Sequence, residues 1–230
     1  MYGTKGLLSF IAVIFLCLNN GPKAGADMIK LPEPEFKGDV SVEKAIHDRR
    51  SVRDFSGIPL SMQEVSQLLW AAGGVTVDGV TGPTRAHPSA GAVYPLEIYL
   101  VAGNVTGLDA GIYRYGWRDN FLVPVRKGDF RPDLANAALR QRMIAYAPAS
   151  IVVTMSAGRV TGAYGRRGLE RYAPMDAGHL GQNVHLQAGS MGLGTVMVGA
   201  FRDDEVWKVL GIKSKGEIPV YIMPVGRPRS

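Results

Sequence analysis

The heptapeptide RRSVRDF, residues 49–55, places three arginines and a serine within five consecutive positions, directly after a short amphipathic segment. Guanidinium groups bind phosphate oxygens in a bidentate manner, and a neighbouring hydroxyl donates to a further oxygen. Arg49, Arg50, Ser51 and Arg53 therefore favour a phosphorylated ligand, with a solvated basic edge or a nucleic-acid contact as the alternatives. Because patches that bind nucleic acid are usually larger and interleaved with exposed aromatic residues, we expect no nucleic-acid partner.

Two helices flank this heptapeptide in the sequence. Ser41 has the place of an N-cap for a short helix that runs into the arginines. On the other side, Ser61 and Glu64 have the spacing of a capping box, and the helix that they start is predicted to stop at Gly73. Residues 74–95 are rich in Gly, Pro, Ser and Thr and predict a long loop, which in a compact domain is functional or disordered.

The remaining elements mix strands and helices without strict alternation, and this mixture predicts an α+β fold rather than a doubly wound sheet. Alternating and continuous apolar runs mark the strands, and apolar residues at helical spacing mark the helices. We predict strands at 96–101, 151–155, 195–201 and 218–225, a hairpin over 111–125 that turns near Asp119-Asn120, and helices at 132–145, 174–191 and 203–210.

The first 26 residues have the order of features of a secretory signal peptide: Lys5, a predominantly apolar run from Leu7 to Leu18, and a small-residue cleavage site ending at Ala26. A membrane-spanning helix needs about 20 apolar residues, so an uncleaved anchor is the alternative. We expect an exported protein, periplasmic or secreted, without stable membrane insertion after cleavage. Cleavage also removes Cys17, the single cysteine, which excludes disulfide and thiol chemistry from the mature chain.

The rest of the chain divides into a proline-punctuated extended lead-in, 27–40, and one main domain, 41–230. The whole chain of 230 residues has a formal net charge of +6, which suits an anionic ligand. Its four histidines lack the spacing of a metal site, and it contains neither a G-x-S-x-G elbow nor a P-loop. These absences disfavour a metal hydrolase, a serine hydrolase and a nucleotide triphosphatase.

Three further segments carry small or basic residues where a ligand would need them. In HPSAGAVYP, residues 87–95, the small residues Ser89, Ala90, Gly91 and Ala92 let backbone amides approach a flat ligand, although a tight turn or a close packing contact is an alternative. MGLGTVMVGAF, residues 191–201, follows a helix and opens a strand, which is the reverse of a dinucleotide-binding phosphate loop. MPVGRPRS at the C-terminus brings Arg227 to a strand end, where it either belongs to a disordered tail or completes a phosphate site.

In order along the chain, RRSVRDF, PSAGAVYPLE, RYAPMDAGHLGQNVHL, GLGTVMVGAF and VYIMPVGRP resemble the nitroreductase superfamily, in particular its SagB- and ThcOx-like dehydrogenases. The resemblance covers nearly all of the predicted mature chain, from Val42 to Pro228. It implies a nitroreductase-like α+β fold, with a central, mostly antiparallel sheet flanked by helices. It also implies FMN, bound without a covalent bond at the interface of a homodimer, and NAD(P)H as a candidate reductant.

The resemblance also implies roles for individual residues. Arg49, Arg50 and Ser51 would hold the phosphate and ribityl chain, and Arg53 would reach the pyrimidine edge of the ring, where reduced flavin gathers negative charge. The other cofactor contacts that it implies are Ser89 and Gly91 from the partner subunit, Leu193 and Gly194 beside the ring, and Arg227 at the phosphate.

The function implied is an FMN-dependent oxidoreductase that moves two electrons between a reductant and an unsaturated, nitroaromatic, quinone-like or heterocyclic small molecule. Two alternatives stay open: an azoline (thiazoline or oxazoline) peptide dehydrogenase, and a non-catalytic protein that binds a flavin or another phosphorylated metabolite. Azoline-oxidising relatives tend to carry a Lys-Tyr pair where this chain has Arg171-Tyr172. Tyr172 is the candidate for proton transfer, because an arginine does not act as a base at ordinary pH.

Overall fold

The computed structural model describes residues 28–79, 82–214 and 216–229. The predicted signal peptide, with its cleavage site and Cys17, lies outside these residues, so export and cleavage stay predictions. Among the helices that the structure describes, none is both long enough and apolar enough to cross a membrane.

A seven-stranded sheet forms the centre of the fold, and every pair of neighbouring strands in it is antiparallel. The predicted α+β class with a mostly antiparallel sheet is therefore confirmed. In spatial order the strands are β1 (Ile29–Lys30), β6 (Phe121–Lys127), β5 (Gly111–Gly116), β4 (Leu96–Ala102), β7 (Ala149–Ser156), β9 (Glu217–Gly226) and β8 (Gly194–Thr195).

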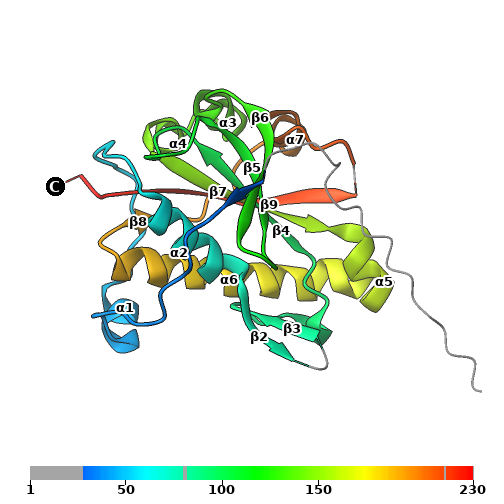
Figure 1. Ribbon diagram of the computed structural model, residues 1–230. Helices are drawn as coiled ribbons and strands as arrows, with labels where there is room; N and C mark the ends of the chain where they lie inside the picture. The colour runs from blue at the N-terminus through cyan, green and yellow to red at the C-terminus, as the bar shows by residue number, and fades with distance from the viewer. Residues whose placement is uncertain (1–27, 80–81, 215, 230) are drawn as a thin grey trace, which may run out of the picture.

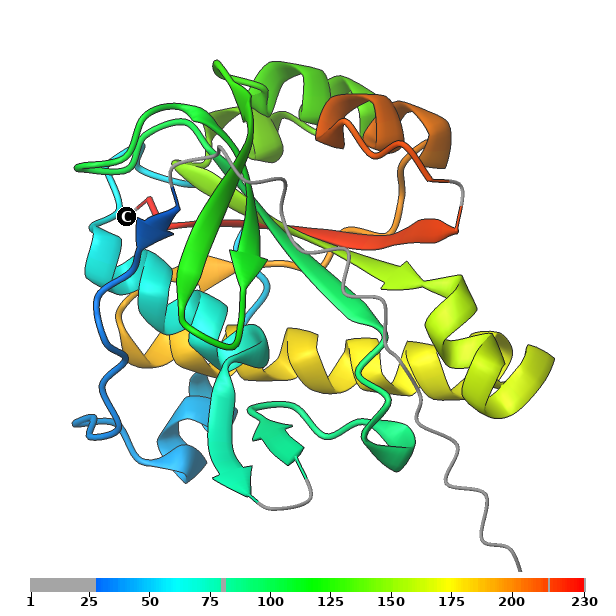
Figure 2. The ribbon, with the colours of Figure 1, turned by 45° about the vertical axis from the view of Figure 1, so that its right-hand side comes forward.

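Helices cover both faces of this sheet, as Figures 1 and 2 show. Successive side chains of a strand point to opposite faces, and in β7 Ile151 and Val153 belong to one core while Val152 belongs to the other. The first core lies under α2 (Met62–Gly73) and α6 (Ala173–Ser190), and the second under α3 (Arg131–Ala137), α4 (Arg142–Tyr146) and α7 (Asp203–Leu210). The strands are thus buried on both sides.

The predicted helix caps are confirmed. Ser41 accepts a hydrogen bond from the backbone of Lys44 at the start of α1 (Val42–Asp48). Ser61 and Glu64 form a reciprocal capping box on α2, whose last residue is Gly73. Helix α6 runs along the sheet for its whole length, with α1 near its C-terminal end and α5 (Ala157–Arg167) near its N-terminal end (Figure 1).

Four predictions of local structure were wrong. The stretch predicted as a loop contains a hairpin, β2 (Val75–Gly79) with β3 (Gly82–Arg85). The helix predicted over 132–145 is broken into α3 and α4, because the backbone of Leu139 and Arg140 has positive φ. The strand predicted over 195–201 pairs only at Gly194–Thr195 and at a single bridge from Val198 to β9. Finally, the lead-in is extended, but its β1 pairs with β6.

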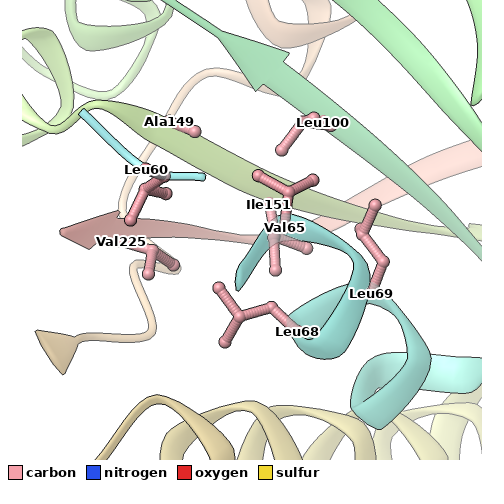
Figure 3. Close-up of a pocket in the computed structure, with 8 residues that line it drawn as sticks. All are labelled: Leu60, Val65, Leu68, Leu69, Leu100, Ala149, Ile151 and Val225. Carbon is pink, nitrogen blue, oxygen red and sulfur yellow. The ribbon is translucent and has the colours of Figure 1, made fainter. Parts of the chain in front are cut away.

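A small apolar cavity lies between α2 and the sheet (Figure 3). Its volume is about 10 Å³, and its lining is aliphatic: Leu60, Val65, Leu68, Leu69, Leu100, Ala149, Ile151 and Val225. A water molecule needs about 10–15 Å³ and polar partners. This cavity is therefore a packing gap in the core and not a ligand site.

Candidate functional site

The arginine-rich heptapeptide lies between β8 and the C-terminal residues. Ser51 pairs with Thr195, and the backbone N–H of Val52 donates to the carbonyl of Thr195 at 3.0 Å. On its other side, Phe55 pairs with Pro228, and the N–H of Arg229 donates to the carbonyl of Asp54 at 3.1 Å. The backbone of the heptapeptide is thus fixed by segments more than a hundred residues away in the sequence.

Close packing explains why a glycine precedes Thr195. A Cβ atom built on Gly194 would lie 2.5 Å from the side chain of Val52. Any larger residue would therefore push the heptapeptide away from β8. The glycine predicted to form a wall beside a ligand is also required for the contact that holds the arginines.

A pocket of about 360 Å³ opens where the heptapeptide, α1, the C-terminal half of α6 and residues 192–195 meet. Leu193 and Gly194 contribute to its wall, and its charged and polar lining residues are Lys44, Asp48, Arg49, Arg50, His185 and Thr195. Three of these are cationic and one is anionic, and Asp48 is already paired with Lys44 and His47. The pocket is therefore suited to an anion.

One buried polar atom in this lining has no hydrogen-bond partner among the described residues, the hydroxyl oxygen of Thr195, a residue that is 1% exposed. Because a buried polar group without a partner is costly, this hydroxyl has capacity for a further hydrogen bond. His185, which is 5% exposed, also lines the pocket, and burial and then the nearby Arg49 lower its pKa.

A second group of predicted residues surrounds the short helical turn η1 (Ala90–Ala92). Ser89 donates its hydroxyl hydrogen to the Asp176 carboxylate at 2.5 Å and accepts the N–H of Tyr94 at 2.9 Å. The N–H of Ala90 also donates to Asp176, at 3.3 Å. The hydroxyl of Ser89 is thus engaged inside the loop, and only the exposed backbone around Gly91 is open to a ligand.

This turn has a strained backbone. Gly91, Ala92 and Tyr94 all have positive φ, at 56°, 54° and 47°. For residues other than glycine this conformation costs about 1–3 kcal/mol each and persists only where the surroundings impose it. Here Asp176, which is 3% exposed, supplies the constraint from the first turn of α6.

The segment before η1 is anchored on the last carbonyls of α2. Arg85 is buried, donates to the Gly73 carbonyl at 2.6 Å and lies against the ring of Trp117. Burial is the main cause that lowers its pKa, to about 10. His87 is fully buried, with its Nδ1 2.7 Å from the Ala72 carbonyl. A cation and a donor at a helix C-terminus complement the helix dipole, so they fix the start of the loop.

Tyr172 lies at the end of η2 (Gly168–Tyr172), a π-helical turn directly before α6. Its hydroxyl accepts a hydrogen bond from Nε of Arg167 at 3.0 Å, and its ring contacts that of Tyr164. Because the guanidinium donates, the phenolic hydrogen of Tyr172 is free to donate to another molecule. Single π-helical turns are often found at functional sites.

The predicted residues thus form two groups at opposite ends of α6. Asp176 holds residues 89–94, which we call the Ser89 loop, and Gly189 lines the pocket beside Arg49 and Arg50, which we call the cationic pocket. Asp176 and Gly189 are 13 residues apart on this helix. At 1.5 Å per residue they are separated by about 20 Å. Figure 2 shows the length of α6 between these two ends.

Three predicted residues lie outside both groups. Ser51 pairs with Thr195 but is not among the residues that line the cationic pocket. Arg53 lines a different pocket, of about 430 Å³, together with Arg142 and Arg229. Arg227 donates to Glu64 at 2.7 Å and to the carbonyl of Pro59. The structure therefore does not bring either arginine to Arg49, and the flavin contacts implied for them stay predictions.

The sequence reasoning missed His185, Thr195 and Asp176. For His185 a signal was present, because Gly181, His185 and Gly189 follow one another at four-residue spacing and so share a helix face. For Asp176, the signal was a carboxylate on the apolar face of a predicted helix. Thr195 carried no local signal.

A model of the Nitroreductase family matches residues 46–227. The chain belongs to the nitroreductase family. A relative from Methanocaldococcus jannaschii that is named as a nitroreductase, MJ1384, is 43% identical over 199 residues, which cover 86% of this chain and 96% of the relative.

Solved structures agree with this family assignment. A Ralstonia eutropha protein described as a nitroreductase has a TM-score of 0.77 and 27% identity, with 88% of this chain and 90% of that chain covered. The NADPH:FMN oxidoreductase of Vibrio harveyi, solved with NAD⁺, shares the fold, with a TM-score of 0.58, 20% identity, and 82% and 69% of the two chains covered. This nitroreductase-family protein is therefore an oxidoreductase of the flavin-dependent kind. The comparisons do not single out the SagB- and ThcOx-like branch.

Proposed function

We propose that this nitroreductase-family protein is an FMN-dependent oxidoreductase that works as a homodimer. It transfers two electrons between a nicotinamide reductant and an unsaturated, nitroaromatic, quinone-like or heterocyclic small molecule. The observation that carries the proposal is the cationic pocket beside RRSVRDF, where Arg49 and Arg50 stand next to the unpartnered hydroxyl of Thr195.

The residues of this pocket fit the phosphate of FMN. Arg49 and Arg50 supply charge-assisted hydrogen bonds, which are roughly twice as strong as neutral ones. The Thr195 hydroxyl supplies a donor that has no competing acceptor among the described residues. A Cβ atom at Gly189 would meet nothing within 4 Å, so the α6 side of the pocket is open. When bound, FMN supplies the two-electron chemistry, and the chain supplies binding and orientation.

The separation of the two groups of residues explains why two copies are needed. Residues about 20 Å apart on one rigid helix do not surround one ligand, and none of the Ser89 loop lines the cationic pocket. In a two-fold dimer the same surface of each copy contacts its counterpart. If two α6 helices lie antiparallel across the axis, the loop of one copy meets the cationic pocket of the other. Tyr172 would then reach the site from the partner, as a proton donor.

Flavin binding and reduction test the enzyme proposal. Protein freed of flavin should bind FMN much more tightly than riboflavin, which lacks the phosphate, and NADPH should bleach the bound flavin in the absence of oxygen. Protein that binds no FMN would overturn the proposal. Protein that binds FMN but is bleached only by dithionite would favour the non-catalytic alternative.

Complementation between two inactive variants tests the shared site. Arg49→Gln damages the cationic pocket, and Ala92→Glu places a negative charge on the exposed turn of the Ser89 loop; Ala92→Gln is the uncharged control. A mixed dimer contains one copy of each variant and has two sites. If each site is shared between the copies, one site carries both substitutions and the other site carries neither. We expect the mixed dimer to bind about one FMN for every two chains. A mixed dimer that binds none would show that each site comes from one copy.

A further inference from the structure

His185 is the one titratable side chain that α6 contributes to the cationic pocket. It is 5% exposed, yet it lines the pocket beside Arg49, Arg50 and Thr195. None of the described residues forms a hydrogen bond with its ring. A histidine in the core normally satisfies at least one ring nitrogen, as His87 does with the carbonyl of Ala72. The ring of His185 therefore has capacity to bind a ligand.

The charged groups around this histidine come from one side of the pocket. Arg49 and Arg50 follow α1, and Lys44 and Asp48 belong to it. Asp48 is engaged by Lys44 and His47, so it does little to neutralise the two arginines. The segment 192–195 and Pro228, which complete the wall, carry no titratable group. From α2, which packs on α6, the nearby Gln67 bonds to Gln187 and is uncharged.

The surrounding positive charge disfavours protonation of the His185 ring. Burial, and then the positive charge of Arg49, lower the pKa of His185. At neutral pH the ring is accordingly uncharged, with one nitrogen that donates and one that accepts. An anion entering the pocket would offset this positive charge, because a phosphomonoester brings a charge of about −1.5 to −2 at pH 7.

We propose that His185 and Thr195 directly contact the anionic group bound in this pocket, and that His185 takes up one proton from solvent as a phosphomonoester binds. The proton leaves a hydronium ion or buffer acid, where its bond breaks, and forms the new N–H bond; the resulting imidazolium donates to a phosphate oxygen. The proposal rests on the proposed function only for the identity of the anion, which is the phosphate of FMN.

The expected size of the effect follows from simple electrostatics. An opposite charge within about 4–6 Å typically moves a pKa by 1–3 units toward the charged form. The bound state therefore holds the proton at a higher pH than the free state does. By linkage, affinity for the anion increases as pH falls through the raised pKa, and it levels off once the free protein is also protonated.

Nuclear magnetic resonance of the histidine rings tests this directly, without any turnover. The Cε1–H signal of His185 is assigned by its loss in His185→Gln. It is then titrated with pH in the flavin-free protein, and again with FMN, with riboflavin and with about 0.1 M sulfate. Sulfate is chosen because it is an anion that does not titrate in this pH range. We expect FMN and sulfate to raise the pKa of His185 by about 1 unit or more, and riboflavin to leave it unchanged. His179→Gln, which removes an exposed histidine from the same helix, should leave the shift in place.

Binding measurements give a second readout. Between pH 8 and pH 6, the FMN affinity of the unmodified protein should increase about tenfold more than the FMN affinity of His185→Gln does. The comparison removes the contribution of the titrating FMN phosphate, because this contribution is the same for both proteins. If FMN binds and neither the pKa nor this difference changes, the proposal is overturned. If FMN does not bind but sulfate raises the pKa of His185, the proposed function fails while the anion contact stands. If neither anion changes the pKa, the contact is refuted.

Discussion

The buried His87 makes the stability of this protein depend on pH in a defined direction. Its Nδ1 faces a carbonyl, which only accepts, so Nδ1 carries the hydrogen and the buried Nε2 has no partner among the described residues. Burial, then the charge of Arg85, lower the pKa of His87 from 6.5 to about 4. Below pH 6.5 the unfolded chain gains a proton at this residue and the native protein does not. The contribution of the neutral His87 to the free energy of unfolding is therefore complete above pH 6.5 and decreases as pH falls toward 4.

The size of this loss follows from the two pKa values. At pH 7, protonation of His87 in the unfolded chain changes the free energy of unfolding by almost nothing. At pH 5 it lowers the free energy of unfolding by about 2 kcal/mol relative to pH 7. For a domain of this size, 1 kcal/mol corresponds to roughly 2–4 °C in melting temperature, so the expected fall is about 4–8 °C. Urea unfolding followed by circular dichroism at pH 7 and pH 5 measures it.

A matched variant isolates the contribution of this one histidine. His87→Asn retains a side-chain amide donor near the Ala72 carbonyl but does not titrate. We expect the variant to be less stable than the unmodified protein at pH 7 but to lose about 2 kcal/mol less between pH 7 and pH 5. Equal losses in the two proteins would refute the argument that the buried neutral ring causes the pH dependence.

Further substitutions test the site and the packing around it. Arg49→Ala should weaken FMN binding about tenfold or more, as calorimetry would show, whereas Arg53→Ala should change FMN binding much less, because Arg53 lines a different pocket. Equal losses of affinity in the two variants would contradict the assignment of the phosphate to the cationic pocket. Asp176→Ala should lower the melting temperature by roughly 5–10 °C, because the strained loop loses a buried charged acceptor worth about 2–3 kcal/mol; an unchanged melting temperature would show that the loop holds itself. Gly194→Ala should cost about 1–3 kcal/mol through overlap with Val52, and Val52→Ala in the same chain should recover part of this, measured by urea unfolding.

Local sequence signals predicted the helices well because caps and apolar spacing act over a few residues. The capping box at Ser61 and the apolar spacing of α6 are such signals. The β2–β3 hairpin was missed because glycine, proline and threonine dominate its composition, although VTVDG carries β-branched residues and a turn-forming Asp-Gly pair. Nothing in the local composition announces the positive φ at Leu139 and Arg140 that divides α3 from α4.

The site was predicted in part, for a related reason. RRSVRDF identified Arg49 and Arg50 as pocket residues, but not the direction of Arg53. Adjacent side chains of an extended segment point to opposite sides, so Val52 faces the pocket while Arg53 faces away. His185 belongs to the cationic pocket, and Asp176 belongs to the group around Ser89. Both memberships depend on contacts between segments that are distant in the sequence, which single-sequence patterns do not reveal.

The separation along the chain of the residues that form the cationic pocket limits when this pocket can form during synthesis. RRSVRDF leaves the ribosome more than a hundred residues before Thr195 and Pro228, which are also parts of the cationic pocket. Domains tend to fold as units at the rate at which their residues become available. A nascent chain that still lacks these residues lacks part of the pocket wall, so the complete pocket can hold an anion only after Pro228 has been made.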